Sequence, residues 1–187
     1  MRKIVLVLLA AVAISSAKGV AIGPQLSLKH DSNDRYIDGY AVLVSTPISG
    51  RMDLFVHAAS HSWRTGVERT SPSHAHEFFY DESTWLLGLR YWFSTQSAVK
   101  PYLHLMVGKY FDTIHYHTTT YDAPFYGLAA EHTSTSRENG SDTGLGFGVA
   151  FLIMSHLFFD MSITSHAATQ LNSHVVLLAG LSCHIGF

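Results

Sequence analysis

The stretch SHVVLLAGLSCHIGF, residues 173–187, is the most informative part of the sequence. From Val175 onward every second residue is apolar, and the residues between become small or polar toward the end. Successive side chains point to opposite faces of a strand, so the segment predicts a strand with one apolar face. A soluble domain rarely buries a terminal carboxylate beside a core aromatic ring. A lipid-facing strand accommodates this ending, with the ring of Phe187 at the membrane interface and the carboxylate in water.

The other end of the sequence predicts the route of export. Arg2 and Lys3 precede an uncharged apolar run from Ile4 to Ile14, and small residues follow as Ser-Ser-Ala at 15–17. This order is typical of a secretory signal peptide, and the apolar run is too short for a spanning helix. We therefore expect a signal peptide over residues 1–17 and one domain over residues 18–187, with an N-terminal anchor as the alternative.

Composition favours a membrane protein that crosses with strands. Hydrophobic residues make up 47% of the chain and charged residues only 14%, yet no apolar run after the first segment approaches the roughly 20 residues of a membrane helix. Without Arg2 and Lys3, ten of the 12 basic residues remain against 14 acidic ones, which argues against a nucleic-acid partner. A single cysteine excludes an intrachain disulfide.

Eight segments of about ten residues or slightly more share the period of two. They are residues 19–29, 38–47, 52–64, 83–94, 101–113, 142–154, 156–167 and the C-terminal strand. The second segment does not reveal which of its faces is apolar. Ten alternating residues are enough for a tilted strand to cross a bilayer. The pattern predicts an all-β fold, an eight-stranded antiparallel up-and-down transmembrane β-barrel.

The connections alternate between short and long, as in outer-membrane barrels with periplasmic turns and longer outer loops. We expect loops at 30–37, 65–82 and 114–141, with the polar stretch Glu131–Ser141 as an exposed loop tip. The alternative is a soluble β-sandwich or lipocalin-like barrel with its apolar faces inward. The polar faces argue against it, because they are rich in Gly and His rather than in Lys and Glu.

Three motifs resemble one known family. They are PYLHLMVGKY at 101–110, the glycine-rich DTGLGFGVAF at 142–151, and the terminal strand. Together they resemble the small eight-stranded outer-membrane barrels of the OmpA transmembrane-domain, OmpX and Ail type. The resemblance implies a monomer in the outer membrane of a Gram-negative bacterium, in contact with lipid and lipopolysaccharide, with both termini periplasmic. It also implies that the barrel-assembly machinery reads the terminal strand, where the signal positions are Leu181, Cys183, Ile185 and Phe187.

The faces opposite the apolar ones carry charged residues and histidines. In a narrow barrel these faces fill the interior, so we expect a lumen polar network. Its members are Asp53, His57, Arg90, His104, Asp112, Asp160 and His166. An unpaired charge in such an interior would be costly, so Arg90 should pair with Asp53, Asp112 or Asp160.

Histidine is unusually frequent, at 13 of 187 residues. Two His-x-His pairs put imidazoles on one face of an extended chain, as in a Zn²⁺ or Cu²⁺ clip. The pairs are His74 with His76 and His115 with His117. The alternative is that these residues only fill space or meet solvent, and the sequence predicts no cofactor.

Lys109 departs from the pattern, because it falls on the apolar face near the outer end of its segment. Its side chain would extend to the interface or meet a lipopolysaccharide phosphate. A misplaced register or a local bulge would explain the same position.

The resulting hypothesis is a non-enzymatic surface protein that acts through its extracellular loops in adhesion, environmental contact or envelope integrity, with an extracellular ligand. One alternative is a narrow, porin-like solute channel or a metal-responsive barrel with a histidine-rich lumen. Another is a lipid A-modifying enzyme. For the enzyme, the adjacent pairs His61–Ser62 and Ser165–His166 are candidates, but neither makes the His-x-Ser-Asn arrangement of lipid A deacylases.

Overall fold

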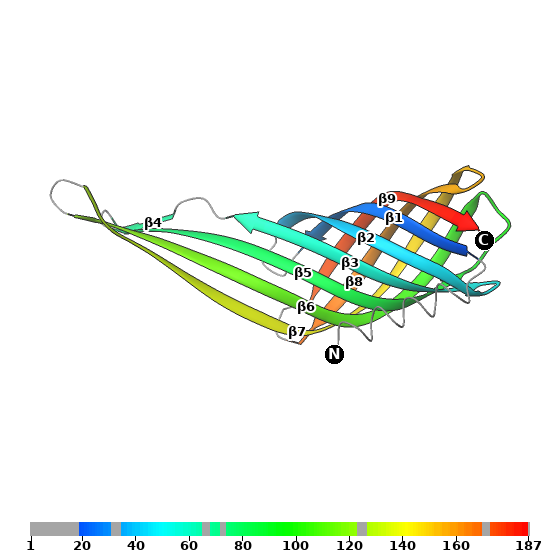
Figure 1. Ribbon diagram of the computed structural model, residues 1–187, viewed down its shortest axis with the longest axis horizontal. Helices are drawn as coiled ribbons and strands as arrows, with labels where there is room; N and C mark the ends of the chain where they lie inside the picture. Colours follow the sequence, from blue (N-terminus) through cyan, green and yellow to red (C-terminus); the bar gives the residue numbers. More distant parts are fainter. Residues whose placement is uncertain are drawn as a thin grey trace.

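Nearly all of the described chain forms β-strands in this computed structural model, which describes residues 19–30, 35–64, 68–71, 74–122, 127–169 and 173–186 (Figure 1). The strands are β1 Gly19–His30, β2 Tyr36–Ser49, β3 Met52–Arg64, β4 Glu68–Ser71, β5 His74–Trp92, β6 Val99–Asp122, β7 Gly127–Met154, β8 Leu157–Ala168 and β9 His174–Gly186. No helix in the described part of the chain is long and apolar enough to cross a membrane. The expected signal peptide over residues 1–17 lies outside the described residues.

Eight of these strands close into a ring. Each pairs antiparallel with the next, β9 pairs with β1, and a β3–β5 pairing completes the circle. Among the described residues, the short β4 pairs with β5 alone, and it lies outside the ring. The predicted eight-stranded up-and-down barrel is confirmed.

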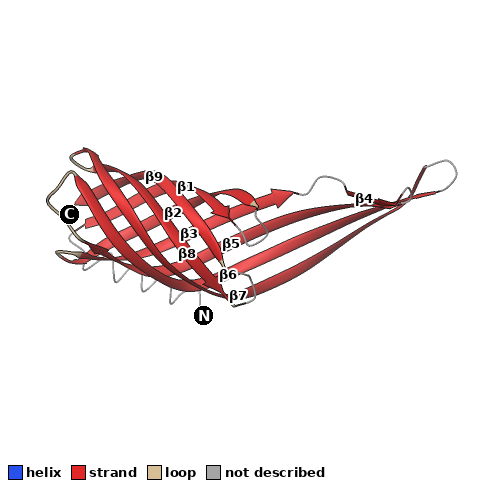
Figure 2. Cartoon of the chain, turned by 180° about the vertical axis from the view of Figure 1, so that it is seen from behind, coloured by secondary structure: helices blue, strands red, loops and turns tan. Residues whose placement is uncertain are grey.

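The strands are staggered around the ring. If one starts at Glu82 of β5 and moves from each residue to its partner on the next strand, one full circuit of the barrel ends at Trp92 of β5. The start and the end are ten residues apart on the same strand. A stagger of this size tilts the strands against the barrel axis, by about 35–45° in most barrels. The tilt is visible in both views (Figures 1 and 2).

The barrel is apolar outside and polar inside. Large apolar side chains such as Leu26, Leu87, Leu105 and Phe147 are exposed on the outer face, while the interior holds the buried charged and polar side chains together with three small apolar clusters. The faces expected from the alternation are the observed ones. In β2, whose phase the sequence left open, Val42 points outward with Tyr40, and Leu43 points inward. A soluble barrel with its apolar faces inward is therefore excluded.

Three strands continue far beyond the ring. β5, β6 and β7 have 19, 24 and 28 residues, against 12 to 14 in the other strands of the barrel. The extension is called the ribbon here and comprises residues 74–78 of β5, 113–122 of β6 and 127–141 of β7, with β4 at its side. Figure 2 shows it standing away from the barrel.

The ribbon corrects two sequence predictions. The expected loops at 65–82 and 114–141 are largely strand, and Glu131–Ser141 lies within β7 rather than at a loop tip. In the β5 and β6 parts the reason is local composition, because Thr, Tyr, Phe and His are frequent there and β-branched and aromatic residues favour strands. The β7 part is rich in Ser, Ala, Glu and Gly, and it is strand because it pairs with β6. Continuous pairing from Thr113↔Arg137 to Thr120↔Ala130 then bonds β6 and β7 to each other along their shared edge.

Glycines on β7 make room for large side chains on β6. Gly140, Gly146 and Gly148 stand directly opposite Tyr110, His104 and Tyr102 in the register. A Cβ built on any of these glycines would collide with the opposite ring. The large rings of β6 can therefore lie across the lumen only because β7 carries no side chain at these positions.

Both ends of the barrel chain lie together. Gly19 pairs with Gly186, at the end of the barrel that also carries the short connections between β2 and β3, β5 and β6, and β7 and β8. The ribbon leaves the opposite end (Figure 1). The turn-bearing end and the ribbon end are thus two distinct faces of the molecule.

Candidate functional site

The side chain of Arg90 lies inside the barrel near the turn-bearing end. The Arg90 guanidinium lies 4.2 Å from the ring centroid of Tyr102 and 5.1 Å from that of Trp92, and its Nη1 is 3.4 Å from Asp160 Oδ2. The Tyr102 hydroxyl donates a hydrogen bond to the same carboxylate. Asp53 stands opposite Arg90 in the register, yet it accepts a hydrogen bond from Trp92 Nε1 at 2.8 Å. Residues from β3, β5, β6 and β8 thus fill this level of the barrel.

The middle of the lumen holds two buried histidines. His104 Nε2 lies 2.8 Å from Thr164 Oγ1, and the ring meets Phe55 edge-on with centroids 6.1 Å apart. His57 is also buried, and neither of its ring nitrogens has a hydrogen-bond partner among the described residues. Rings and hydroxyls together pack this level.

A third polar group lies closer to the ribbon end. Glu82 forms an ion pair with Lys29 and accepts a hydrogen bond from the Tyr80 hydroxyl at 3.0 Å. His61 Nδ1 stands 3.4 Å from the other oxygen of Glu82, and His61 Nε2 is 2.7 Å from Ser27 Oγ. Strands β1, β3 and β5 supply these side chains.

Ser27, His61 and Glu82 follow the order of a nucleophile, a base and an orienting acid. Their exposed fractions are only 4%, 2% and 2%, and Lys29 and Tyr80 already engage the carboxylate. A hydrolase needs space beside the hydroxyl for a substrate carbonyl and donors for the developing oxyanion. The arrangement therefore fits a structural polar cluster better than a catalytic triad, and His61 Nδ1 and Glu82 Oε1 form no hydrogen bond with each other.

The sequence-adjacent pairs considered for an enzyme do not form dyads. His61 and His166 point into the lumen, while Ser62 and Ser165 are exposed on the outer face. Neighbouring residues of a strand face opposite ways, so such pairs are separated by the barrel wall.

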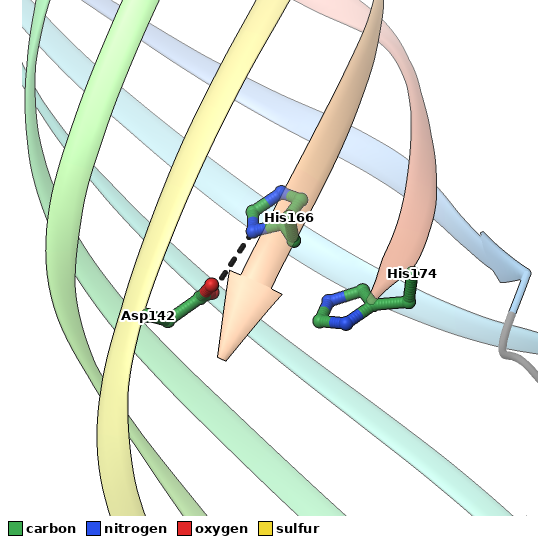
Figure 3. Close-up of side chains that lie close together, drawn as sticks. All are labelled: Asp142, His166 and His174. Carbon is green, nitrogen blue, oxygen red and sulfur yellow. Dashed lines mark hydrogen bonds and ion pairs between the residues drawn. The ribbon is translucent and has the colours of Figure 1, made fainter. Parts of the chain in front are cut away.

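A histidine pair and a carboxylate meet at the ribbon end of the lumen. Figure 3 shows Asp142 of β7, His166 of β8 and His174 of β9 converging inside the barrel. His166 Nδ1 lies 2.9 Å from Asp142 Oδ2, and the two imidazole rings stack with centroids 4.8 Å apart and planes 9° apart. One donor atom of each residue lies within 4.8 Å of the other two.

Sequence reasoning found only His166 of this cluster. Asp142 begins a predicted strand segment and His174 lies in the terminal strand, and neither is among the predicted lumen residues. Both could have been found by parity, since Asp142 shares the inward face with Gly144 and His174 shares it with His184.

The seven expected lumen residues all lie buried inside the barrel, but they occupy different levels. Arg90 meets Asp160, and His166 meets Asp142, which was not among the seven. Asp112 stands opposite Glu82 in the register, away from Arg90. The interior is therefore a stack of separate polar groups.

The two His-x-His pairs lie on opposite faces of the ribbon. His74 and His76 continue the face that Glu82 presents to the lumen, and His115 and His117 continue the outer face that carries Lys109. His76 Nδ1 and His115 Nδ1 each lie 3.1 Å from a threonine hydroxyl on the next strand. The pairs therefore cannot combine into one four-histidine site.

Charged side chains stiffen the base of the ribbon. Arg64 Nε donates to Glu77 Oε1 at 2.5 Å, and the Arg64 guanidinium lies 4.5 Å from the Phe79 ring centroid. The hydrogen bond from Arg64 lowers the pKa of the Glu77 carboxyl below its ordinary value. The Glu77 carboxylate therefore stays ionised to lower pH than an isolated glutamate.

Lys109 lies on the outer face, as the alternation indicates, and its Nζ donates to Ser141 Oγ at 2.9 Å. The register through Trp85↔Lys109 and Lys109↔Ser141 is continuous, which excludes a misplaced register or a bulge at this point. Leu181, Cys183 and Ile185 are likewise exposed on the outer face of β9, and Phe187 lies outside the described residues.

No protein-family model and no curated protein matches the sequence. Among solved structures, the N-terminal β-barrel domain of Pseudomonas aeruginosa OprF is similar, with 12% identity, a TM-score of 0.57, and coverage of 90% of this chain and 98% of that one. Ail of Yersinia pestis in complex with the heparin analogue sucrose octasulfate is 10% identical, with a TM-score of 0.56 and coverage of 89% of this chain and 97% of that one. OprG of Pseudomonas aeruginosa is 12% identical, with a TM-score of 0.55 and coverage of 91% of this chain and 98% of that one. The neighbours are outer-membrane barrels, and at these identities the likeness confirms the expected resemblance at the level of the fold.

Proposed function

We propose that the protein is a non-enzymatic outer-membrane barrel that uses its ribbon at the cell surface. A signal peptide over residues 1–17 would deliver it to the envelope of a Gram-negative bacterium, and the barrel-assembly machinery would insert it through the strand ending at Phe187. Both termini then lie in the periplasm, the outer face meets lipid and lipopolysaccharide, and the barrel works as a monomer. The ribbon carries adhesion, environmental contact or a contribution to envelope integrity.

The length of three neighbouring strands is the observation that carries this proposal. Membrane crossing needs about 9–11 tilted residues, and β6 and β7 have more than twice that number. Residues 130–139 of β7 are exposed almost without interruption, so the ribbon is not buried against the barrel. A protruding sheet of this kind has no part in closing the ring, which points to a role in contact with other molecules.

The ribbon offers a free sheet edge. Within the described residues, β7 pairs with β6 along the whole ribbon but with β8 only from Asp142 onward. The other edge of residues 127–140 therefore presents backbone donors and acceptors that an added strand can use. At Ser141 the backbone N–H and C=O are already bonded to Thr169. We infer that the extracellular ligand includes an extended peptide segment of another protein.

A polyanionic ligand fits the ribbon less well. The Ail structure holds a heparin analogue, and a sulfated ligand of that kind requires clustered cations. At the base of the ribbon, Arg64 of β3 pairs with Glu77, and on the ribbon Arg137 is followed by Glu138 in β7. The charges are mixed, and hydroxyl and aromatic side chains dominate the surface.

The lumen argues against the channel alternative. The Arg90, Tyr102 and Asp160 side chains meet across the interior, and the interior of an eight-stranded barrel is just wide enough for its side chains. Planar-bilayer recordings of the purified protein should show no discrete single-channel steps. Regular unitary currents that disappear when Arg90 is replaced by a larger aromatic residue would support a channel instead.

The ribbon-truncated protein tests the proposal. Pairing places Trp63 opposite Tyr80 and Thr113 opposite Arg137, so each pair can be joined by an Asn-Gly turn. Cells expressing the truncated chain should lose their adhesion to protein-coated surfaces and keep the barrel, which heat-dependent migration on gels detects. Equal adhesion and equal detergent tolerance with the full and truncated chains would contradict a function of the ribbon.

A further inference from the structure

We propose that Asp142, His166 and His174 bind a divalent transition-metal ion of the zinc class at the ribbon end of the lumen. This site goes beyond the surface function of the ribbon and does not depend on it. It also differs from the two His-x-His pairs, because all three of its residues lie inside the barrel.

The three side chains come from consecutive strands. His166 and His174 are directly paired across β8 and β9, and Asp142 on β7 lies diagonally opposite His166, whose direct neighbour is Gly144. Because Gly144 has no side chain, the Asp142 carboxylate can reach the His166 ring. Figure 3 shows the three groups on one side of the lumen wall.

The spacing of the donor atoms suits a small cation. Three atoms that lie within 4.8 Å of one another surround a point about 2.8 Å from each at most. Zinc takes imidazole nitrogen and carboxylate oxygen at roughly 2.0–2.2 Å, so shifts of about 0.7 Å close the site. The two imidazole planes are only 9° apart, so their in-plane nitrogen lone pairs do not converge in this arrangement, and binding of the ion also requires one ring to turn about its side-chain torsions.

The donor set and its surroundings also fit. Two imidazoles and one carboxylate form the ligand set of several zinc and iron sites, with an open position for water. The exposed fractions of Asp142, His166 and His174 are 1%, 5% and 6%, so bulk water competes little. Asp142 Oδ1 has no hydrogen-bond partner among the described residues, which leaves one buried carboxylate oxygen available to a cation.

The position suggests what a bound ion does. His174 is the first residue of β9, His166 is two residues from the end of β8, and Asp142 follows the ribbon part of β7. An ion held by all three would tie the β8–β9 hairpin to the base of the ribbon. We therefore expect zinc to raise the thermal stability of the folded barrel as well as to bind.

The test uses the full mature chain, refolded in detergent without a polyhistidine tag. Titration calorimetry with Zn²⁺ should give one ion per chain, and Co²⁺ as a probe should give the visible absorption of a low-coordinate site. The temperature at which the folded band is lost on gels should rise with Zn²⁺. Absence of stoichiometric Zn²⁺ binding by the wild-type protein would overturn the proposal and leave a hydrogen-bonded cluster only.

Matched variants locate the site. His166→Gln with His174→Gln should abolish stoichiometric binding, and His115→Gln with His117→Gln, which removes two histidines from the ribbon, should leave it unchanged. Asp142→Asn keeps the side-chain volume and should weaken binding by more than about tenfold, since even indirect partners of metal ligands contribute that much. His174→Cys keeps a zinc donor and should retain binding, which separates ligation from ring stacking. If zinc binding persisted in the His166→Gln, His174→Gln variant and disappeared in the His115→Gln, His117→Gln variant, the assignment would be refuted.

Discussion

Arg90 is a buried cation whose contacts hold one level of the lumen together. It is 5% exposed, it pairs with Asp160, and three aromatic rings surround its guanidinium. A buried ion pair contributes little net stability when it is intact, but removal of one partner leaves an uncompensated charge in a poorly solvated place. The barrel is therefore expected to tolerate loss of the whole pair better than loss of one half.

Arg90→Met should destabilise the barrel by about 3–5 kcal/mol, because Asp160 is left charged and unpaired. The double variant with Asp160→Asn should recover most of that loss, since the amide oxygen still accepts from Tyr102 and no charge remains. Reversible urea unfolding in lipid vesicles measures both. A double variant no more stable than Arg90→Met would show that the pair is not what holds this level together.

Ser27 tests the non-enzymatic assignment at the same scale. Its hydroxyl lies 2.7 Å from His61 Nε2, as in serine hydrolases, but it is almost completely buried. We expect a fluorophosphonate probe to leave the folded protein unlabelled. Labelling that is lost in Ser27→Ala and in His61→Gln would reverse the assignment.

Sequence parity identified which residues face inward, and it did so for Asp53, Arg90 and Asp160 alike. It did not identify their partners, because partners depend on the stagger between strands that are distant in sequence. Asp53 shows the limit, since it is the direct neighbour of Arg90 yet bonds to Trp92. For the same reason the cluster of Asp142 with His174 could not be recognised as a site before the register was known.

The pairing of β6 with β7 explains why one strand is so rich in glycine. Large inward rings on β6 stand opposite inward glycines on β7. Each such pair therefore places only one side chain in the lumen. Small and large residues on facing strands are how narrow barrels fit their interiors.

Gly148→Ala should cost about 1–3 kcal/mol, because the new methyl group collides with the Tyr102 ring that is held by Asp160. Gly50→Ala is the matched control, since nothing lies within 4 Å of a Cβ at that position, and it should change stability by less than about 0.5 kcal/mol. Urea unfolding of both variants under one condition gives the comparison. Equal effects would mean that the close fit to Tyr102 is not important.

The ribbon shows where element prediction from sequence stopped. The barrel strands were recognised because one face is apolar, and period two is then visible. In the ribbon both faces are polar, so residues such as Thr133 and Ser134 alternate without contrast and resemble a loop. Strand propensity of Thr, His and Tyr was the remaining signal, and it indicates strand without indicating pairing.

At the scale of the whole molecule, the barrel follows from one repeated physical requirement. Every backbone group that crosses a membrane must be bonded within the protein, and a closed ring of strands achieves this. The alternation of the terminal strand suits such a ring, because Leu181, Cys183 and Ile185 point outward and Ser182 points inward. Closure by β9 on β1 then brings Gly186 beside Gly19.

The proposed orientation places the ribbon outside the cell and the short turns in the periplasm. Whole-cell labelling tests it, with Cys183→Ser as the background and single cysteines at Ser134 on the ribbon and at Gly50 in the β2–β3 turn, both of which are exposed. A membrane-impermeant maleimide should label Ser134→Cys on intact cells, and Gly50→Cys only after the outer membrane is permeabilised. Labelling of Gly50→Cys on intact cells with protection of Ser134→Cys would contradict the account.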